Sequence, residues 1–241
     1  QTEEERLRTA ELIRPILRGR DIKRYGYNWA DLWLIWIPWH FPLHEDSTIV
    51  GASEKAELAF KNNYFALYKH LETYKDALSK RNKAETGIRY EWYALQRWGA
   101  NYKDDFFKPK IIFQEIVQES QFLLDYNMYF FCNDTGRIIT GEHLYHLLGI
   151  LNSKLFFFAV KHFYGGGVLG EHGIRMKHTF FEKFPCIPCD SKIEYYAKKL
   201  QENYSNTFNQ ILNDYIMTLY KLTEEEKLYI KENLIQSPQN Q

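Results

Sequence analysis

The sequence has 241 residues and lacks the marks of several protein classes. Its 31 Lys and Arg residues balance its 31 Asp and Glu residues, so only local clusters could attract a charged partner. Three cysteines, an odd number, argue against the disulfide framework of a secreted domain. The longest apolar run, 151–160, is too short to cross a bilayer, and the N-terminus resembles no signal peptide. We therefore expect a soluble cytoplasmic protein without membrane contact, and we expect the chain to be a piece of a longer one.

Motifs of known catalysts are also missing. There is no P-loop, no G-x-S-x-G and no Asn-Pro-Pro-aromatic tetrapeptide, since no two of the 7 prolines are adjacent. Gly165 to Gly170 matches G-x-G-x-x-G, but no helical pattern and no suitably spaced acid follow it, so we expect a loop rather than a dinucleotide site. Asp21-Ile22-Lys23 resembles the end of a metal-dependent nuclease motif but lacks its paired acid. The sequence therefore predicts no catalytic residue and no cofactor in this chain.

Candidate metal ligands occur at two places. Cys186 and Cys189 form a C-x-x-C motif, but zinc would need two further ligands, and Cys132 is the only other cysteine. Redox activity would need a βαβ frame and an activated thiol. His143 and His146 are three residues apart on an expected helix, without a third ligand at a specified spacing. We predict that the cysteines form a structural turn, that the histidines pack or lie at the surface, and that the chain has no metal site.

Positive charge is concentrated near the start of the chain. Residues 6–24 contain seven Lys or Arg residues against two acids. Within the segment 13–25, Gly19 stands between Arg18 and Arg20, and a glycine allows a turn that β-carbons would forbid. The two arginines could then project from a tight bend, as recognition of phosphate and guanine requires. The alternative is a strand-turn-strand with a solvated basic face.

Two further basic clusters follow. Residues 80–110 contain eight Lys or Arg residues against four acids, and tyrosines and tryptophans lie among them. The third cluster follows the glycine-rich loop. The segment 190–241 has six lysines against eight acids, so we expect it to form helices that pack on the domain rather than to bind a polyanion.

The periodicity of apolar residues predicts an α+β fold with a mixed or antiparallel sheet, helical insertions and a C-terminal helical segment. We expect one domain at 1–189 and the helical segment at 190–241. The expected strands are 32–37, apolar on both faces and therefore central, 111–117, 122–132 and, after the turn Asn133-Asp134-Thr135-Gly136, a hairpin strand at 137–140. The expected helices are 53–78 with Ser53 as N-cap, 143–151, 154–163, 193–219 and one that begins at the capping box Thr223 to Glu226.

Several segments together resemble a known family. They are Ile13 to Tyr25, Trp92 to Trp98, Lys108 to Phe113, Leu148 to Lys154 and the proline-containing exit Phe184 to Pro188. This arrangement resembles the TaqI-like C-terminal specificity domains of adenine-N6 DNA methyltransferases. Such domains are widespread in type IIG restriction-modification enzymes and in related phage-defence methyltransferases.

The resemblance implies a target-recognition module without chemistry of its own. Its partners would be double-stranded DNA and an upstream methyltransferase domain of the same polypeptide, which binds S-adenosylmethionine and flips the target adenine. A fused endonuclease, with Mg²⁺, is left open for the parent protein. We expect arginines to read bases and lysines mostly to contact phosphates. The predicted DNA-binding residues are Arg14, Arg18, Arg20, Lys23, Arg24, Arg89, Arg97, Lys108, Lys110, Arg175, Lys177 and His178.

Two alternatives belong to other classes. The chain could act alone as a nuclease or a methyltransferase, in which case the purified fragment would cleave or methylate DNA. It could instead be a protein-interaction module that uses the tyrosine-rich C-terminal helices, in which case it would form oligomers and show no salt-dependent binding to DNA.

Overall fold

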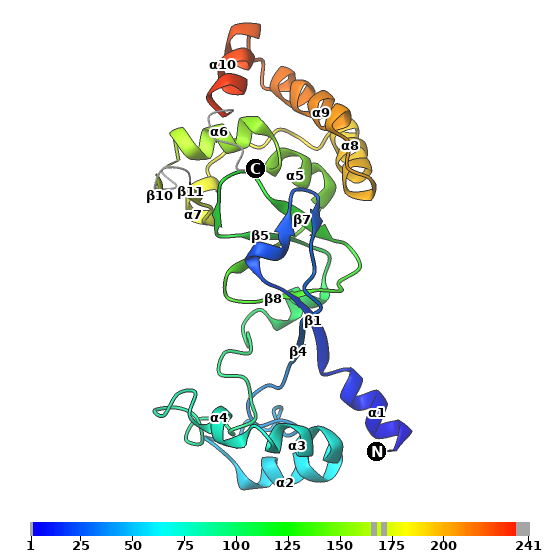
Figure 1. Cartoon of the computed structure of the whole chain (residues 1–241), viewed down its shortest axis with the longest axis vertical. Coiled ribbons are helices and arrows are strands. Elements are labelled where there is room, and N and C mark those ends of the chain that lie inside the picture. Colours follow the sequence, from blue (N-terminus) through cyan, green and yellow to red (C-terminus); the bar gives the residue numbers. More distant parts are fainter. Residues whose placement is uncertain (1, 165–167, 170–172, 235–241) are drawn as a thin grey trace. The chain divides into compact units, whose positions relative to one another are not determined.

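Helices and several small sheets alternate along the chain in the computed structural model, which confirms the expected α+β class (Figure 1). The structure describes residues 2–164, 168–169 and 173–234. The chain divides into two compact units, and each unit is built from two separate stretches of sequence. Unit 1 comprises Gln1–Pro15 and Leu32–Asp104, and unit 2 comprises Ile16–Asp31 and Asp105–Gln241.

Unit 1 contains α1 (Glu3–Ala10), the first residues of β1 (Ile13–Leu17), β4 (Trp33–Ile35), α2 (Glu54–Asn63), α3 (Phe65–Glu72) and α4 (Lys75–Ser79). One helix was expected over 53–78, but the backbone leaves the helical conformation at Tyr64 and Tyr74. The N-cap is confirmed, since the backbone N–H of Ala56 donates to Ser53 Oγ at 3.2 Å. The strand expected to be central is instead short β4, whose residues are partly or fully exposed and pair antiparallel with β1.

The core of unit 1 is aromatic. Phe60 is fully buried, and its ring centroid lies 4.5 Å from that of Tyr93 and 5.7 Å from that of Phe41. The buried carboxylate of Glu91 accepts backbone N–H groups from His40 at 2.7 Å and from Ser53 at 2.9 Å. A buried carboxylate that is bonded in this way ties the loop before α2 to the aromatic core.

The main sheet of unit 2 has the order β7 (Phe122–Asp125), β5 (Lys110–Gln114), β9 (Gly136–Thr140), with antiparallel neighbours. The expected turn at 133–136 is confirmed by the bond from Gly136 N to Asn133 O at 3.0 Å. The expected hairpin is wrong, because β9 pairs with β5 rather than with β8 (Phe131–Cys132), the strand before the turn. β8 instead runs parallel to the end of β1.

Smaller elements of unit 2 surround this sheet. The hairpin of β2 (Ile22–Lys23) and β3 (Gly26–Tyr27) follows the 3₁₀ turn η1 (Gly19–Asp21). A second small sheet has the order β10 (Val168–Leu169), β11 (Gly173–Arg175), β6 (Ile116–Val117). A further 3₁₀ turn, η2 (Lys103–Phe107), begins in the last two residues of unit 1 and precedes β5.

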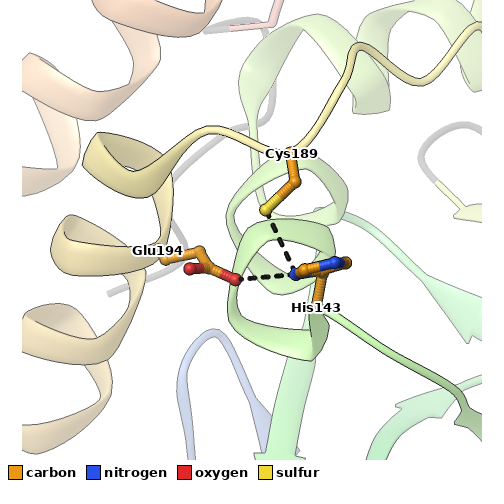
Figure 2. Close-up of side chains that lie close together, drawn as sticks. All are labelled: His143, Cys189 and Glu194. Atoms are coloured by element: carbon orange, nitrogen blue, oxygen red, sulfur yellow. Dashed lines mark hydrogen bonds and ion pairs between the residues drawn. The ribbon is translucent and has the colours of Figure 1, made fainter.

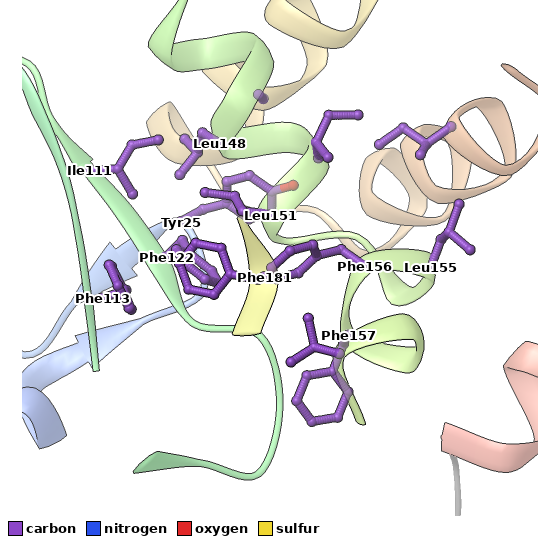
Figure 3. Packing of buried hydrophobic residues seen from close by; sticks show 14 of the residues in the cluster. Tyr25, Ile111, Phe113, Phe122, Leu148, Leu151, Leu155, Phe156, Phe157 and Phe181 are labelled. Atoms are coloured by element: carbon purple, nitrogen blue, oxygen red, sulfur yellow. The ribbon is translucent and has the colours of Figure 1, made fainter. Parts of the chain in front are cut away.

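Helices cover the main sheet and share its core (Figure 3). The helices of unit 2 are α5 (Leu144–Leu151), α6 (Lys154–His162), α7 (His178–Phe181), α8 (Ser191–Glu202), α9 (Asn206–Leu219) and α10 (Glu224–Leu234). The single helix expected over 193–219 is two, since Asn203 is extended and Ser205 caps a new helix. The capping box that begins α10 is confirmed, because Thr223 and Glu226 exchange side-chain to backbone bonds.

Two amide side chains close the free edge of β7. Asn152 accepts from Phe122 N at 3.0 Å and donates to Phe122 O at 2.9 Å, as a neighbouring strand would. Gln201 on α8 does the same at Leu124, at 2.9 and 2.8 Å. These bonds satisfy backbone groups that an open edge would expose, and they fix α8 against the sheet.

Helices α5 and α8 approach closely at Gly149. A β-carbon at this position would lie 2.6 Å from Ile193 Cγ2, so only glycine fits without displacing α8. The expected boundary at 189/190 therefore lies within unit 2, and the C-terminal helices contribute to the same hydrophobic core as the strands. Within the described ranges, no helix is both long enough and apolar enough to span a membrane.

Candidate nucleic-acid interface

The bend at Gly19 is a 3₁₀ turn. A glycine is required here because neighbouring atoms leave no room for a β-carbon, and not because the backbone adopts an unusual angle. The φ angle of Gly19 is not among the positive values of the chain. A β-carbon there would lie 2.9 Å from Thr135 Oγ1 and 3.1 Å from the backbone oxygen of Thr135. Gly19 N donates to the same hydroxyl at 2.9 Å. The bend is therefore fastened to the turn that precedes β9.

The two arginines of this bend behave differently. Arg18 folds back onto Asp21, with Nε to Oδ2 at 3.0 Å and Nη2 to Oδ1 at 2.7 Å. The Arg18 side chain lowers the pKa of the Asp21 carboxyl below its usual value, because these bonds favour the charged form. Arg20 is exposed. The expectation that both arginines project from the bend is therefore corrected: Arg18 braces it, and Arg20 extends into solvent.

A carboxylate next to the bend holds two further arginines. Glu115 lies between β5 and β6, and its Oε2 pairs with Arg137 Nη2 while its Oε1 lies 3.7 Å from Arg175 Nε. The Glu115 side chain is only 20% exposed, whereas those of Arg137 and Arg175 are 45% and 41% exposed. We refer to these three residues as the Glu115 cluster. One acid against two cations leaves a net positive charge. Arg137 is held by hydrogen bonds to Glu115 and to the backbone oxygens of Asp134 and Gly136, whereas Arg175 is joined to Glu115 by the longer ion pair.

Thr135 links Glu115 to the Gly19 bend. The backbone N–H of Glu115 donates to Thr135 O at 3.3 Å, and Thr135 Oγ1 is the acceptor for Gly19 N. Thr135 Oγ1 also donates to Asn133 Oδ1 at 2.6 Å. Hydroxyl and amide side chains thus lie among the arginines, and these are the groups that hydrogen-bond base edges and phosphates.

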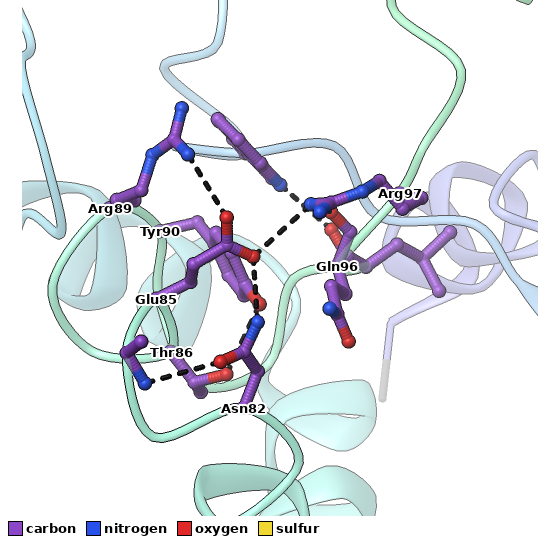
Figure 4. Close-up of polar contacts among 10 residues, drawn as sticks. Asn82, Glu85, Thr86, Arg89, Tyr90, Gln96 and Arg97 are labelled. Carbon is purple, nitrogen blue, oxygen red and sulfur yellow. Dashed lines mark hydrogen bonds and ion pairs between the residues drawn. The ribbon is translucent and has the colours of Figure 1, made fainter.

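Unit 1 carries a second cluster of the same kind (Figure 4). Glu85, 14% exposed, pairs with Arg89 at 3.0 Å and with Arg97 at 3.1 Å, and these side chains are 58% and 67% exposed. Asn82 Nδ2 donates to the same carboxylate at 2.8 Å. The Arg89 guanidinium also lies over the Trp39 ring at 5.4 Å. We refer to Glu85, Arg89 and Arg97 as the Glu85 cluster.

Lys110 lies in the interior of unit 2. Its side chain is 0% exposed, and its Nζ donates to Asp125 Oδ2 at 2.7 Å and to Phe106 O at 2.9 Å. Asp125 also accepts the backbone N–H groups of Tyr129 and Phe130, which fixes the turn after β7. The prediction that Lys110 contacts DNA is therefore wrong, because no part of this side chain reaches the surface.

Comparison with protein families identifies the family of the chain. Residues 14–185, well over half of the chain, match the model of the TaqI-like C-terminal specificity domain. The chain belongs to this family. The specificity domain therefore serves DNA target recognition in a methyltransferase-type protein. Comparison with individually curated proteins gives no significant match.

The remaining predicted residues of the specificity domain lie in several surroundings. Arg24 is bonded to Glu119 at 2.8 Å and to Ser120 O at 3.2 Å, and Lys23 Nζ donates to Arg20 O at 3.0 Å. Lys108 is exposed and pairs with Asp105 at 2.8 Å. The others are placed as follows: Arg14 half-buried in β1, Lys177 half-buried as the N-cap residue of α7, and His178 exposed in its first turn. The G-x-G-x-x-G segment lies largely outside the described residues.

Three further cations of the chain, which the sequence did not single out, lie near the candidate residues. Arg137 directly follows the Asn-Asp-Thr-Gly turn, and a loop-tip arginine is the kind of residue expected to read bases. Lys154 and Lys231 line a polar cavity of about 370 Å³ together with Arg24. Partial burial and the nearby charges of Arg24 and Lys231 lower the pKa of Lys154. Only the fold brings these last two lysines together, since they lie on α6 and α10.

Proposed function

We propose that this specificity domain reads a defined sequence in double-stranded DNA on behalf of an adenine-N6 methyltransferase of a restriction-modification or phage-defence system. The Glu115 cluster beside the Gly19 bend is the observation that carries the proposal. In it, two guanidinium groups from distant parts of the chain lie beside one carboxylate and remain partly open to solvent, and the guanidinium of Arg137 is hydrogen-bonded to that carboxylate. Arginines held in this way lose little freedom on binding, which favours bidentate contact with guanine.

The proposal divides the cations of unit 2 into two roles. Arg20, Arg137 and Arg175 would contact base edges, together with the polar residues of the turn before β9. Lys23, Lys108 and the cavity around Arg24 and Lys154 would contact phosphates, because lysines act as point charges. Arg24, Lys154 and Lys231 line one polar cavity, where a phosphate would face several cations. In unit 1, Arg89 and Arg97 would add phosphate contacts.

The chemistry of the parent protein would come from elsewhere in the polypeptide. We propose an upstream methyltransferase domain that binds S-adenosylmethionine and acts on the extruded adenine, with a fused Mg²⁺-dependent endonuclease as a further possibility for the type IIG arrangement. The role of the present chain would be to fix the position of the duplex by contacts to backbone and bases. It would transfer no methyl group itself.

The test is binding of the purified chain to duplex DNA. A random-sequence duplex pool should bind with an affinity that falls steeply as salt rises, because phosphate contacts release counterions. Repeated selection from that pool should enrich one short motif. Arg137→Gln should weaken binding to the selected motif, whereas Lys198→Gln, which removes an exposed cation of α8, should not.

Other outcomes would point to the rival classes. A flat salt response without an enriched motif would contradict DNA recognition. Methylation or cleavage by the isolated chain would show a stand-alone enzyme. Stable oligomers together with no DNA binding would show a protein-interaction module.

A further inference from the structure

A histidine, a cysteine and a glutamate meet at the surface of unit 2 although they lie far apart in the sequence (Figure 2). His143 is the N-cap residue of α5, Cys189 lies in the exit loop after α7, and Glu194 lies in the first turn of α8. One nitrogen, His143 Nδ1, faces both partners: it lies 3.3 Å from Cys189 Sγ and 3.5 Å from Glu194 Oε1. All three ligand atoms lie within 4.8 Å of one another.

The two distances from His143 Nδ1 agree with those of a tetrahedral zinc ion, and the sulfur and the carboxylate oxygen lie within 4.8 Å of each other. With Zn–N and Zn–O bonds of about 2.0 Å and a Zn–S bond of about 2.3 Å, a tetrahedron separates N from S by about 3.5 Å and N from O by about 3.3 Å. The observed distances of 3.3 and 3.5 Å differ from these by about 0.2 Å each. A single ring nitrogen can direct one hydrogen or one lone pair at one partner, whereas one cation would engage all three groups.

We propose that His143, Cys189 and Glu194 bind a Zn²⁺ ion, with water in the fourth position. Imidazole, thiolate and carboxylate are all zinc ligands, and a site with three protein ligands keeps one position open. The thiolate selects zinc over Mg²⁺ and Ca²⁺, which prefer oxygen ligands. The sequence did not predict this site, because the three residues show no metal-binding spacing.

Neighbouring bonds hold the loop that carries Cys189 in place. The buried His146 contacts this loop on both sides: Asp190 N donates to His146 Nδ1 at 3.2 Å, so His146 Nε2 carries the hydrogen that is donated to Ile187 O at 3.2 Å. Asp190 in turn caps α8 through the backbone N–H of Ile193 at 3.0 Å. The loop geometry is therefore fixed without a metal, which lowers the entropic cost of binding one.

The helices that supply the other two ligands are also fixed. Gly149 of α5 lies against Ile193, the residue before Glu194, with no room for a β-carbon. His143 has φ +50°, a left-handed conformation that is uncommon for residues other than glycine but that histidine adopts more often than most, and it directs the ring from the start of α5. Zinc bound here would fasten α5, the exit loop and α8 to one another. The proposed role is structural, at the start of the C-terminal helices.

Metal binding to the full chain tests the proposal. In the presence of a non-thiol reductant, Co²⁺ should bind with a stoichiometry of one and give visible absorption and a thiolate charge-transfer band, and Zn²⁺ should displace it. Zn²⁺ should also raise the melting temperature, because it binds the folded chain. Cys189→Ser, Glu194→Gln and His143→Asn should each weaken Zn²⁺ binding by tenfold or more; asparagine tolerates the left-handed backbone at 143.

Matched variants separate this site from adventitious binding. Cys186→Ser removes the other exposed cysteine of the C-x-x-C motif, and His70→Asn removes an exposed histidine of α3. Both should bind Zn²⁺ as the unaltered chain does and should melt at a similar temperature in the absence of metal. A charge-transfer band that survives in Cys189→Ser, or no uptake of an equimolar amount of Co²⁺, would overturn the proposal. DNA binding is measured separately, so failure of the metal site leaves the proposed function untouched.

Discussion

The Glu85 cluster of unit 1 and the Glu115 cluster of unit 2 each contain one glutamate and two arginines, but they are assembled from differently spaced parts of the sequence. In each, one carboxylate of low exposure, 14% or 20%, holds two arginines that are at least 41% exposed. The Glu85 cluster is local, because its members fall within 13 residues of sequence and Glu85 and Arg89 are four residues apart. The Glu115 cluster joins three distant segments at the point where β5 gives way to β6.

This difference bears on what each cluster can do. The local cluster lies among aromatic rings such as Trp39, and its arginines are the more exposed of the two pairs. The distant cluster adjoins the Gly19 bend and the hydroxyl of Thr135. We therefore expect the Glu115 cluster to determine which sequence is bound and the Glu85 cluster to determine how strongly any duplex is bound.

The largest expected difference is in the free energy of unfolding, between loss of a buried cation and loss of an exposed one. Lys110→Met removes one member of a fully buried pair and leaves the Asp125 carboxylate without its cation, so the free energy of unfolding should fall by about 3–5 kcal/mol. Arg97→Met and Arg137→Met remove exposed partners and should each cost less than about 1 kcal/mol. Urea denaturation monitored by circular dichroism measures the three values. Equal losses would show that the two exposed clusters serve the fold rather than a ligand.

The two clusters should differ next in DNA binding. Arg137→Gln should weaken binding to the selected motif by about 1–3 kcal/mol and should change binding to random duplexes much less. Arg97→Gln should weaken both by a similar factor and reduce the slope of affinity against salt. Fluorescence anisotropy across a salt series gives both quantities. If Arg97→Gln rather than Arg137→Gln loses discrimination between the selected motif and random duplexes, the roles assigned to the two clusters are wrong.

Neutralising the two carboxylates should separate the effect of arginine orientation on DNA binding from the effect of net charge. Glu115→Gln and Glu85→Gln each remove one negative charge, so both should raise affinity for random duplexes by a few fold at low salt. Glu115→Gln should also reduce discrimination between the selected motif and random DNA, because Arg137 and Arg175 both lose their ion pair with this carboxylate. Competition binding at constant salt measures this ratio. Unchanged discrimination in Glu115→Gln would contradict a base-reading role for this cluster.

The smallest expected effect is the pH dependence of the stability that Asp21 contributes in the bend beside the Glu115 cluster. The pKa of Asp21 is lowered in the folded chain by Arg18, so this carboxylate stabilises the fold above its unfolded pKa of about 3.8. The contribution is lost as pH falls through the folded pKa. The difference in melting temperature between the unaltered chain and Asp21→Asn should therefore be constant near neutral pH and shrink below about pH 4. Asp104→Asn, at an exposed position, should show no such change.

Much of the secondary structure followed from local signals. Ser53 and the Thr223–Glu226 box are confirmed caps, and α5 and α6 lie where the apolar periodicity placed them. The errors have specific causes. The sequence could not show that β9 would pair with β5, because an Asn-Asp-Thr-Gly turn is compatible with either neighbour. Nor could it show that the long helices would break at Tyr64 and Asn203.

The sequence shows where positive charge concentrates but not the surroundings of each cation. Basic clusters at 6–24 and 80–110, and a third at Arg175, Lys177 and His178, were visible, since clustering of charge is a property of sequence. Arg18 and Lys110 were assigned to DNA, but the structure pairs them with Asp21 and Asp125. A lysine next to a strand gives the same sequence pattern whether its ammonium group points to solvent or to a buried carboxylate.

The sequence by itself determined the family, the α+β class and the regions where positive charge concentrates, because motifs, periodicity and composition are local. The tertiary structure alone decided which cations are internal and which reach the surface, because that depends on acids that lie elsewhere in the chain. It also brought His143, Cys189 and Glu194 to one point. The sequence of one segment does not reveal which distant segment it will contact in the folded chain.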